Sequence, residues 1–196
     1  EAQKNWQARV DALVRQLGGE DQVRYRNLEG RCRSILEQQP PMQSSAQGIQ
    51  AQGEGLGRLV WVYLRLLVTR QAITRLLRGA PAGTSEAEAL EERIAGLKGR
   101  LGEALSEELR KSIAGQIEIL EQRLERRQEA KHKLAFLDSE LTRIQEQVEL
   151  VREQAVLSAD PETLSRRIDE VTATLGGTTQ WIRDQQKIYG AVEDLM

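Results

Sequence analysis

The side chains that most often carry nucleophilic or metal chemistry are nearly absent from this sequence. It contains one histidine, His132, and one cysteine, Cys32. A catalytic triad or a zinc site needs several such groups at defined spacing, and no HExxH or CxxC pattern occurs. Cys32 falls on the apolar stripe of its own helical pattern, where a small buried hydrophobe is expected. The sequence therefore predicts no catalytic residue, no metal ligand and no cofactor, and a protein that is not an enzyme.

A basic cluster, RLERRQEAKHK, runs from Arg123 to Lys133. Arg127 and Lys131 stand at positions of an apolar repeat where leucine is expected. Polar residues at such seam positions set the register and the choice of partner in coiled coils, so these two are candidate register-setting residues. The alternative is a surface for phosphate or nucleic acid. Glutamates interleave with the basic residues and no aromatic residue is present for base stacking, so nucleic acid is not an expected partner.

The most apolar part of the chain is RLVWVYLRLLVTRQAITRLLR, residues 58–78, which holds five arginines and no acid. Its apolar run is shorter than the roughly 20 residues that a membrane span requires. A helix that is apolar nearly all round is typical of a buried core helix, with its arginines reaching outward at the edges. The alternative is a basic face for anionic lipid, phosphate or an acidic partner helix. The candidate partner or anion contacts are Arg58, Trp61, Tyr63, Arg65 and Arg70.

The composition favours long helices that pack along seams. Charged residues make up 30% of the chain and aromatic residues 4%, whereas charged residues average about 25% in globular proteins. Leucine, isoleucine and valine supply the apolar surface, as in bundles and coiled coils. A single cysteine excludes an internal disulfide and favours a reducing, cytoplasmic location. The chain begins without methionine, and we expect it to be a fragment of a longer protein.

The N-terminal part of the chain predicts helices separated by glycine and proline. Apolar residues spaced by three and four predict a helical segment over residues 1–38, which Gly18 and Gly19 interrupt or divide into two helices. Residues 39–56 contain two prolines and three glycines and predict a flexible linker. Residues 57–103 then predict the central apolar helix and a second, shorter helix.

The shorter helix begins at a predicted capping box, in which Ser85 and Glu88 would satisfy each other's backbone amides. Glycines weaken its end, and a break is expected near residues 102–106. Between Glu107 and Leu157 no proline occurs, and apolar residues alternate at steps of four and three. This seam shifts by three residues near Leu134, which is a local overwinding of a coiled coil.

Residues 104–196 together predict a long antiparallel helical hairpin. Asp160 is a good N-cap and Pro161 suits the first position of a helix, so the last helix begins there and turns back on the long one. Thr178 and Gln185 occupy two positions of the last apolar seam. Two glycines followed by an aromatic residue form a candidate hinge, made of Gly176, Gly177 and Trp181.

The sequence thus predicts an all-α fold, an elongated helical bundle with a long antiparallel coiled-coil hairpin. The expected function is that of a non-enzymatic coiled-coil interaction or scaffold module of a larger protein. It would act through oligomerisation, most simply as a homodimer, or through docking of a protein partner. The alternative is a membrane-surface helical scaffold that binds anionic lipid through the arginine-rich residues 58–78.

Overall fold

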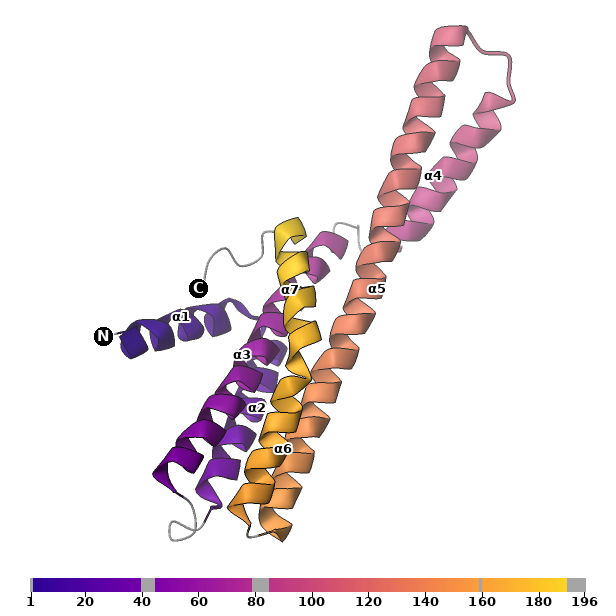
Figure 1. The fold of residues 1–196 in the computed structure, drawn as a ribbon. Coiled ribbons are helices and arrows are strands. Elements are labelled where there is room, and N and C mark those ends of the chain that lie inside the picture. The colour runs from indigo at the N-terminus through magenta and orange to yellow at the C-terminus, as the bar shows by residue number, and fades with distance from the viewer. Residues whose placement is uncertain (1, 40–44, 79–84, 159, 190–196) are drawn as a thin grey trace. The chain divides into compact units, whose positions relative to one another are not determined.

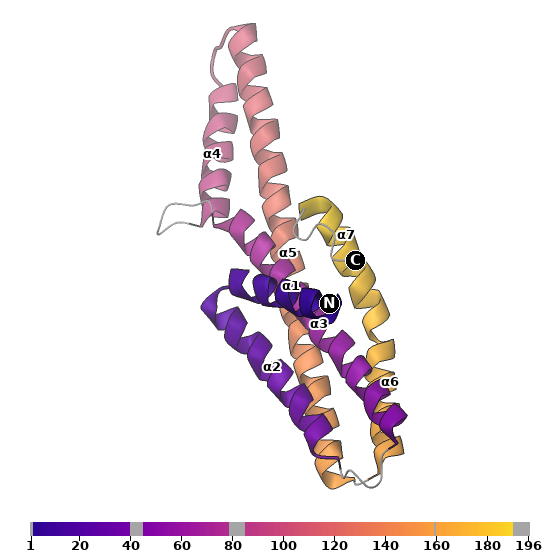
Figure 2. The same ribbon diagram turned by 90° about the vertical axis from the view of Figure 1, so that its left-hand side faces the viewer.

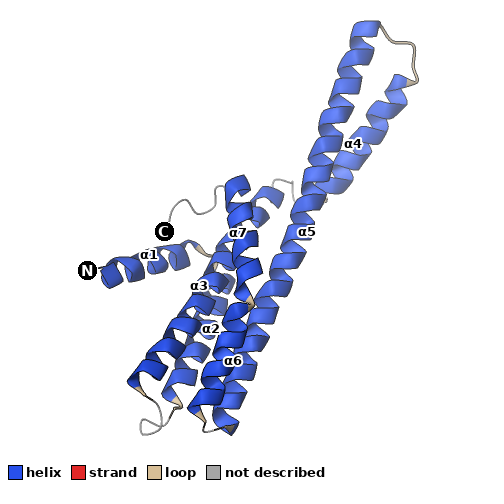
Figure 3. Ribbon diagram, in the orientation of Figure 1, coloured by secondary structure: helices blue, strands red, loops and turns tan. Residues whose placement is uncertain are grey.

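The protein is all-α helical (Figures 1 and 3), as the sequence predicted. The computed structural model describes residues 2–39, 45–78, 85–158 and 160–189. Within these ranges it contains seven helices and no strand. They are α1 (Ala2–Gln16), α2 (Gly19–Glu37), α3 (Ala46–Leu77), α4 (Glu86–Leu101), α5 (Glu107–Leu157), α6 (Pro161–Ala173) and α7 (Leu175–Tyr189).

Most helix ends lie where local sequence signals put them. α5 has the predicted bounds, and the expected break at residues 102–106 separates it from α4. Asp160 caps α6, because its carboxylate accepts hydrogen bonds from the backbone N–H groups of Glu162 and Thr163, both at 3.2 Å. The predicted capping box at the start of α4 does not form. Ser85 is the N-cap residue, but its side chain makes no capping hydrogen bond.

The flexible linker predicted over residues 39–56 is wrong for residues 46–56, which belong to α3. Residues 40–44, with both prolines, lie outside the described residues. The glycine-rich start of α3 is helical because it packs on α6. The side chain of Gln52 is 2% exposed and donates hydrogen bonds to the Ser165 hydroxyl (2.6 Å) and to the backbone carbonyl of Pro161 (3.2 Å). Tertiary packing here outweighs the low helix propensity of glycine.

The chain forms two compact units, which do not follow the order of the sequence. The first unit combines residues 1–72 with residues 137–196, and the second comprises residues 73–136. Both α3 and α5 therefore contribute residues to each unit.

In the first unit, α2, α3, the C-terminal part of α5, and α6 with α7 form a four-helix bundle (Figure 1). Hydrogen bonds and ion pairs between helices define their directions, since residue numbers that rise on one helix fall on its antiparallel neighbour. For α2 and α3 the pairs are Asp21–Arg70 and Gln39–Gln52, and for α3 and α5 they are Tyr63–Gln145 and Arg70–Asp138. Along α5 and the last two helices the pairs are Gln154–Arg167, Gln147–Thr174 and Arg143–Thr178. All three helix pairs are antiparallel.

The centre of this bundle is α3. Its residues Leu59, Leu64, Leu66 and Leu67 are at most 1% exposed, because α2, α5 and the α6–α7 pair surround it. The prediction of a central core helix at this apolar stretch is confirmed. On α5 the same core is filled by Leu137, Leu141, Ile144, Val148 and Val151. Thr178 and Gln185 are buried in the last seam, as their positions predicted.

The second unit pairs α4 with the N-terminal part of α5. Its buried residues are Leu90 and Ile94 on α4 and Ile113, Ile117 and Leu120 on α5, with partly buried leucines around them. Lys98 of α4 forms an ion pair of 2.8 Å with Glu121 of α5. An isoleucine–leucine seam between two helices is what the alternating steps of four and three predict.

The register shift of α5 lies earlier than the sequence indicated. The buried and half-buried seam positions run from Leu120 through Leu124 and Arg127 to Ala130, which is 5% exposed. The extra step of three therefore falls between Arg127 and Ala130, and Lys131 is exposed. The shift falls at a small residue, Ala130, whereas the pattern of larger side chains leads through Lys131.

Candidate functional site

The helix α1 packs differently from the helices of the bundle. It runs across the direction of α2 and α3 instead of alongside them (Figure 2). One face carries Trp6, Val10, Val14 and Leu17, at spacings of four, four and three. The last three of these side chains are 4–7% exposed, while most of the other residues of α1 are exposed. A single apolar stripe therefore attaches α1 to the bundle.

The outer end of this stripe is an aromatic pair. The ring centroids of Trp6 on α1 and Trp61 on α3 lie 4.6 Å apart, with a tilt of 55° between the rings. Trp6 nevertheless remains 41% exposed. Tilted aromatic pairs at this distance contribute about 0.5–1.5 kcal/mol beyond the burial of their surface.

The inner end of α1 is a tight turn into α2. The side-chain oxygen of Gln71 accepts a hydrogen bond from the Gly18 N–H (2.9 Å), and its amide nitrogen donates to the carbonyl of Gln16 (2.8 Å). Gly18 has φ −61° and ψ 156°, which any residue adopts. A Cβ at Gly18 or Gly19 would meet no atom within 4 Å. The turn geometry thus does not require glycine at either position.

A pocket of about 300 Å³ lies between α1, α2 and α3. Each helix turns one face towards it, and the α3 face consists of Gly53, Gly57 and Trp61, each one turn after the other. A Cβ at Gly57 would meet no atom within 4 Å. Around the pocket stand Trp6, Gln7, Val10, Tyr25, Glu29, Cys32, Arg33 and Leu36, with Leu56 and Val60 beside the glycines.

Two weakly acidic groups line the pocket and stay protonated at neutral pH. Burial, together with the carboxylates of Glu29 and Asp11, raises the pKa of the Tyr25 hydroxyl to about 12. Burial and Glu29 likewise raise the pKa of the Cys32 thiol to about 12. Cys32 is 4% exposed, which confirms its prediction as a small buried residue. At the rim, Arg33 and Glu29 form an ion pair of 3.9 Å.

The candidate partner or anion contacts predicted on α3 do not form one surface in the structure. Arg58 is exposed and Trp61 half-buried. Tyr63 is 0% exposed, and its hydroxyl accepts a hydrogen bond of 2.6 Å from Gln145 of α5. The prediction that Tyr63 contacts a partner or an anion is therefore wrong, because the bundle covers the face of α3 on which it lies.

The remaining two arginines are engaged within the first unit. Arg65 donates to the side-chain oxygen of Gln186 on α7 at 2.8 Å. Arg70 donates to Asp138 on α5 at 2.7 Å and lies 3.5 Å from a carboxylate oxygen of Asp21 on α2. The basic residues of α3 therefore point to different neighbours and do not form one basic face.

The candidate register-setting residues have different surroundings. Arg127 is half-buried and forms an ion pair with Glu86 at the start of α4, and it also donates to the backbone carbonyl of Leu77 at 3.5 Å. Lys131 is exposed, so its predicted place in the seam is wrong. Since Arg127 stands where the seam shifts, its pairing with α4 gives it a structural role at that point.

The candidate hinge lies beside a real break in the helix. α6 ends at Ala173 and α7 begins at Leu175, with Thr174 between them. Gly176 and Gly177 are exposed in the first turn of α7, and a Cβ at either would meet no atom within 4 Å. They are therefore not a point of close helix approach. Trp181 is half-buried.

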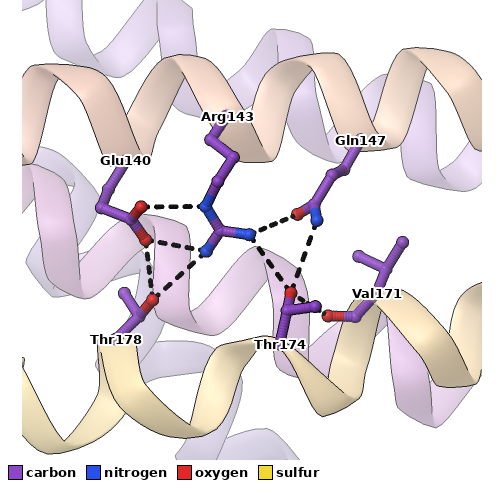
Figure 4. Close-up of polar contacts among 6 residues, drawn as sticks. All are labelled: Glu140, Arg143, Gln147, Val171, Thr174 and Thr178. Carbon is purple, nitrogen blue, oxygen red and sulfur yellow. Dashed lines mark hydrogen bonds and ion pairs between the residues drawn. The ribbon is translucent and has the colours of Figure 1, made fainter.

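A polar network spans this break (Figure 4). Arg143 of α5 donates two hydrogen bonds of 2.8 Å to Glu140 and further ones to Gln147 and Thr174, both at 3.2 Å. The buried hydroxyl of Thr178 donates to Glu140 at 2.7 Å. The hydrogen bond from Arg143 holds the pKa of Glu140 below its usual value. The network fixes the broken helix against α5 and carries no group poised for chemistry.

Sequence reasoning missed both this network and the pocket. The polar seam position of Thr178 was visible, but its partners on α5 depend on how the two helices meet. For the pocket, the available signal was the spacing of Gly53, Gly57 and Trp61 on one helical face. In the sequence pattern, Gly53 belongs to the predicted linker, Gly57 to the start of the predicted central helix, and Trp61 to the candidate partner or anion contacts.

Across the described ranges, no three His, Cys, Asp or Glu side chains come together as ligands for a metal ion. None of the described helices combines the length and apolar character needed to cross a membrane. No protein-family model, curated protein or solved structure matches the chain at a significant level.

Proposed function

We propose that this chain is a non-enzymatic helical interaction module that associates with a second copy of itself by exchanging α1. The observation that carries the proposal is the attachment of α1. The helix α1 packs on the bundle through one apolar stripe. Two glycines, which the turn geometry does not require, join it to α2.

The contacts of α1 also define what can occupy its place. The surface on α2 and α3 fits an apolar stripe spaced as Trp6, Val10 and Val14, and a second copy presents the same stripe. Exchange of an identical element between two chains preserves the contacts of the apolar stripe and costs little besides the entropy of association. The second copy is therefore the occupant that the surface fits best.

The turn at Gly18 supplies the change of shape that exchange requires. In the closed chain α1 ends at Gln16 and α2 begins at Gly19. In the exchanged dimer the two would fuse into one helix, which would gain the backbone hydrogen bonds that the turn lacks. Glycine disfavours that continuous helix by about 1 kcal/mol at each position. The two glycines thus lower the stability of the exchanged dimer relative to the closed chain and help to set the equilibrium between the two forms.

The experiment measures mass and exchange together. Sedimentation velocity over a range of concentrations is expected to show a monomer–dimer equilibrium. In a Cys32→Ala background, chains with Trp6→Cys are mixed with chains with Trp61→Cys and treated with a short bis-maleimide reagent. Exchange predicts a cross-linked heterodimer, since Trp6 and Trp61 then meet across two chains.

A matched control uses two chains that both carry Trp61→Cys, which offer the reagent no partner on α1. A monomer at every concentration would contradict the proposal. If the mixed sample gives no more cross-linked dimer than this control, exchange of α1 is not the basis of the dimer.

The membrane-surface alternative has less support. Of the aromatic and basic residues that it relied on, Tyr63 is buried, and Arg65 and Arg70 bond to side chains of α7, α5 and α2. Arg58, Arg75 and Arg78 are exposed, but Arg58 belongs to the first unit and the other two to the second. Co-sedimentation with anionic vesicles tests this alternative directly, and salt-sensitive binding would restore it.

A further inference from the structure

We propose that the pocket between α1, α2 and α3 is a binding site for a small organic cation, namely a fused two-ring aromatic molecule that carries an amine. The pocket's size, its glycines, its indole rings and its polar groups each support one part of this assignment. The proposal does not depend on self-association, because the closed chain supplies every residue around the pocket and an exchanged α1 would supply the same ones.

The volume sets the size of the ligand. The pocket measures about 300 Å³, at the lower end of the range for small-molecule sites. An apolar cavity of about 150 Å³ accommodates one benzene ring. Two fused rings therefore match the space, whereas a nucleotide or a larger cofactor would exceed it.

The glycines of α3 show that the space is a feature of the sequence. Glycine costs about 1 kcal/mol relative to alanine inside a helix, so each one in α3 needs a physical reason. Gly55 has one, because a Cβ there would lie 2.7 Å from Ile168. Gly57 has no atom near its missing Cβ, yet it faces the pocket. The absence of a side chain at Gly57 keeps the pocket open.

The aromatic walls select a flat ligand. Trp6 and Trp61 meet at 55° and leave parts of both rings uncovered, as the partial exposure of each indicates. A planar ring can pack against these indoles in an offset or edge-to-face arrangement. A positive charge close to an indole face is attracted by the ring's quadrupole, which favours a cation over a neutral or anionic ligand.

The polar groups provide the place for the amine. Tyr25 is 6% exposed and lines the pocket, and among the described residues no group hydrogen-bonds to its hydroxyl. Glu29, one turn further along α2, adds a carboxylate. Arg33 is its ion-pair partner, but at 3.9 Å and with its side chain 67% exposed it remains a loose one. An ammonium group can therefore bond to Glu29 and the Tyr25 hydroxyl while Arg33 turns to solvent.

Calorimetric titration with three probes of the same ring system tests the assignment. Tryptamine carries an ammonium group, indole carries no charge, and indole-3-acetate carries a carboxylate. We expect tryptamine to bind most tightly and indole-3-acetate most weakly. Failure of all three to bind would overturn the site, and tighter binding of indole-3-acetate than of tryptamine would overturn the assignment to a cation.

Two glycine variants locate the binding. Gly57→Leu places a side chain in the pocket and is expected to weaken tryptamine binding by roughly tenfold or more. Gly30→Leu on α2 is the matched control, since Gly30 is also a helical glycine of the first unit with open space at its Cβ. It lies outside the pocket and is expected to leave binding unchanged. Equal effects of both variants would contradict the location.

Tyr25→Phe removes the hydroxyl alone and is expected to weaken tryptamine binding by roughly three- to tenfold, with a smaller effect on indole. An identical loss for both probes would contradict the proposed bond to the amine. Circular dichroism melting of each variant separates a loss of binding from a loss of folding. Calorimetry measures ligand binding and sedimentation measures mass. Failure of this proposal would therefore appear in the titration, and failure of self-association in the sedimentation experiment.

Discussion

Gly55 of α3 and Ile168 of α6 approach each other so closely that a Cβ at position 55 would lie 2.7 Å from the Cγ2 of Ile168. The hydroxyl of Thr172, one turn further along α6, would lie 3.4 Å from the same Cβ. Only glycine allows α3 and α6 to pack at this separation. This contact explains why a glycine-rich segment, which the sequence presented as a linker, is part of a buried helix.

Gly55→Ala is therefore expected to destabilise the protein, by about 1–3 kcal/mol, because the added methyl group forces the stiff β-branched side chain of Ile168 to move. Urea unfolding followed by circular dichroism measures the change. Gly57→Ala, two residues away, is the matched control. Nothing lies within 4 Å of its Cβ, so it is expected to stabilise the helix by about 1 kcal/mol at most. Equal destabilisation by both variants would contradict the close contact.

The Gly18–Gly19 turn predicts variants of opposite effect on self-association. Replacing both glycines by alanine favours the continuous helix and is expected to raise the dimer fraction, by roughly fivefold in the equilibrium constant for each glycine in each of the two chains. Gly19→Pro is expected to lower it, since proline suits the first position of α2 but breaks a helix that continues through it. Sedimentation velocity measures both variants. If the dimer fraction responds to neither variant, self-association does not depend on this turn.

The network around Arg143 predicts a pH-dependent contribution to stability. Arg143 lowers the pKa of Glu140 in the folded state, so the stabilisation is present above the carboxyl's unfolded pKa and is lost as the pH falls through the lowered folded value. Glu140→Gln is therefore expected to reduce the free energy of unfolding at neutral pH and to have little effect in acid. Urea unfolding at both pH values measures the difference. A loss of equal size at both would show that the charge of Glu140 is not involved.

Cys32 is expected to react slowly with thiol reagents in the native protein. It is 4% exposed, and burial raises the pKa of its thiol to about 12, so the reactive thiolate is rare at neutral pH. Labelling with a chromogenic disulfide reagent is expected to accelerate strongly in urea. Since Cys32 lines the pocket, tryptamine is expected to slow the native reaction further. Rapid labelling without urea would contradict the closed packing of α1, α2 and α3.

The candidate site was less predictable than the helices that build it. The buried Cys32 and the buried seam positions Thr178 and Gln185 followed from helical periodicity, because each lies on the apolar face of its own helix. Tyr63 lies on an equally apolar helix, and nothing local indicated that α5 would cover it. Lys131 was placed in the seam because the repeat was traced through large residues, while the structure uses Ala130.

Local sequence signals were sufficient to predict the helical class, the bounds of α5, the start of α6 at Asp160 and the core character of α3. These depend on backbone propensity, capping and the 3.6-residue period, all of which act over a few neighbouring residues. Packing between helices determines that residues 46–56 are helical, where α5 shifts its register, and that three helix faces enclose a pocket. Each of these depends on which faces of helices distant in the chain come into contact, and the free energy of that packing is not encoded in any single segment.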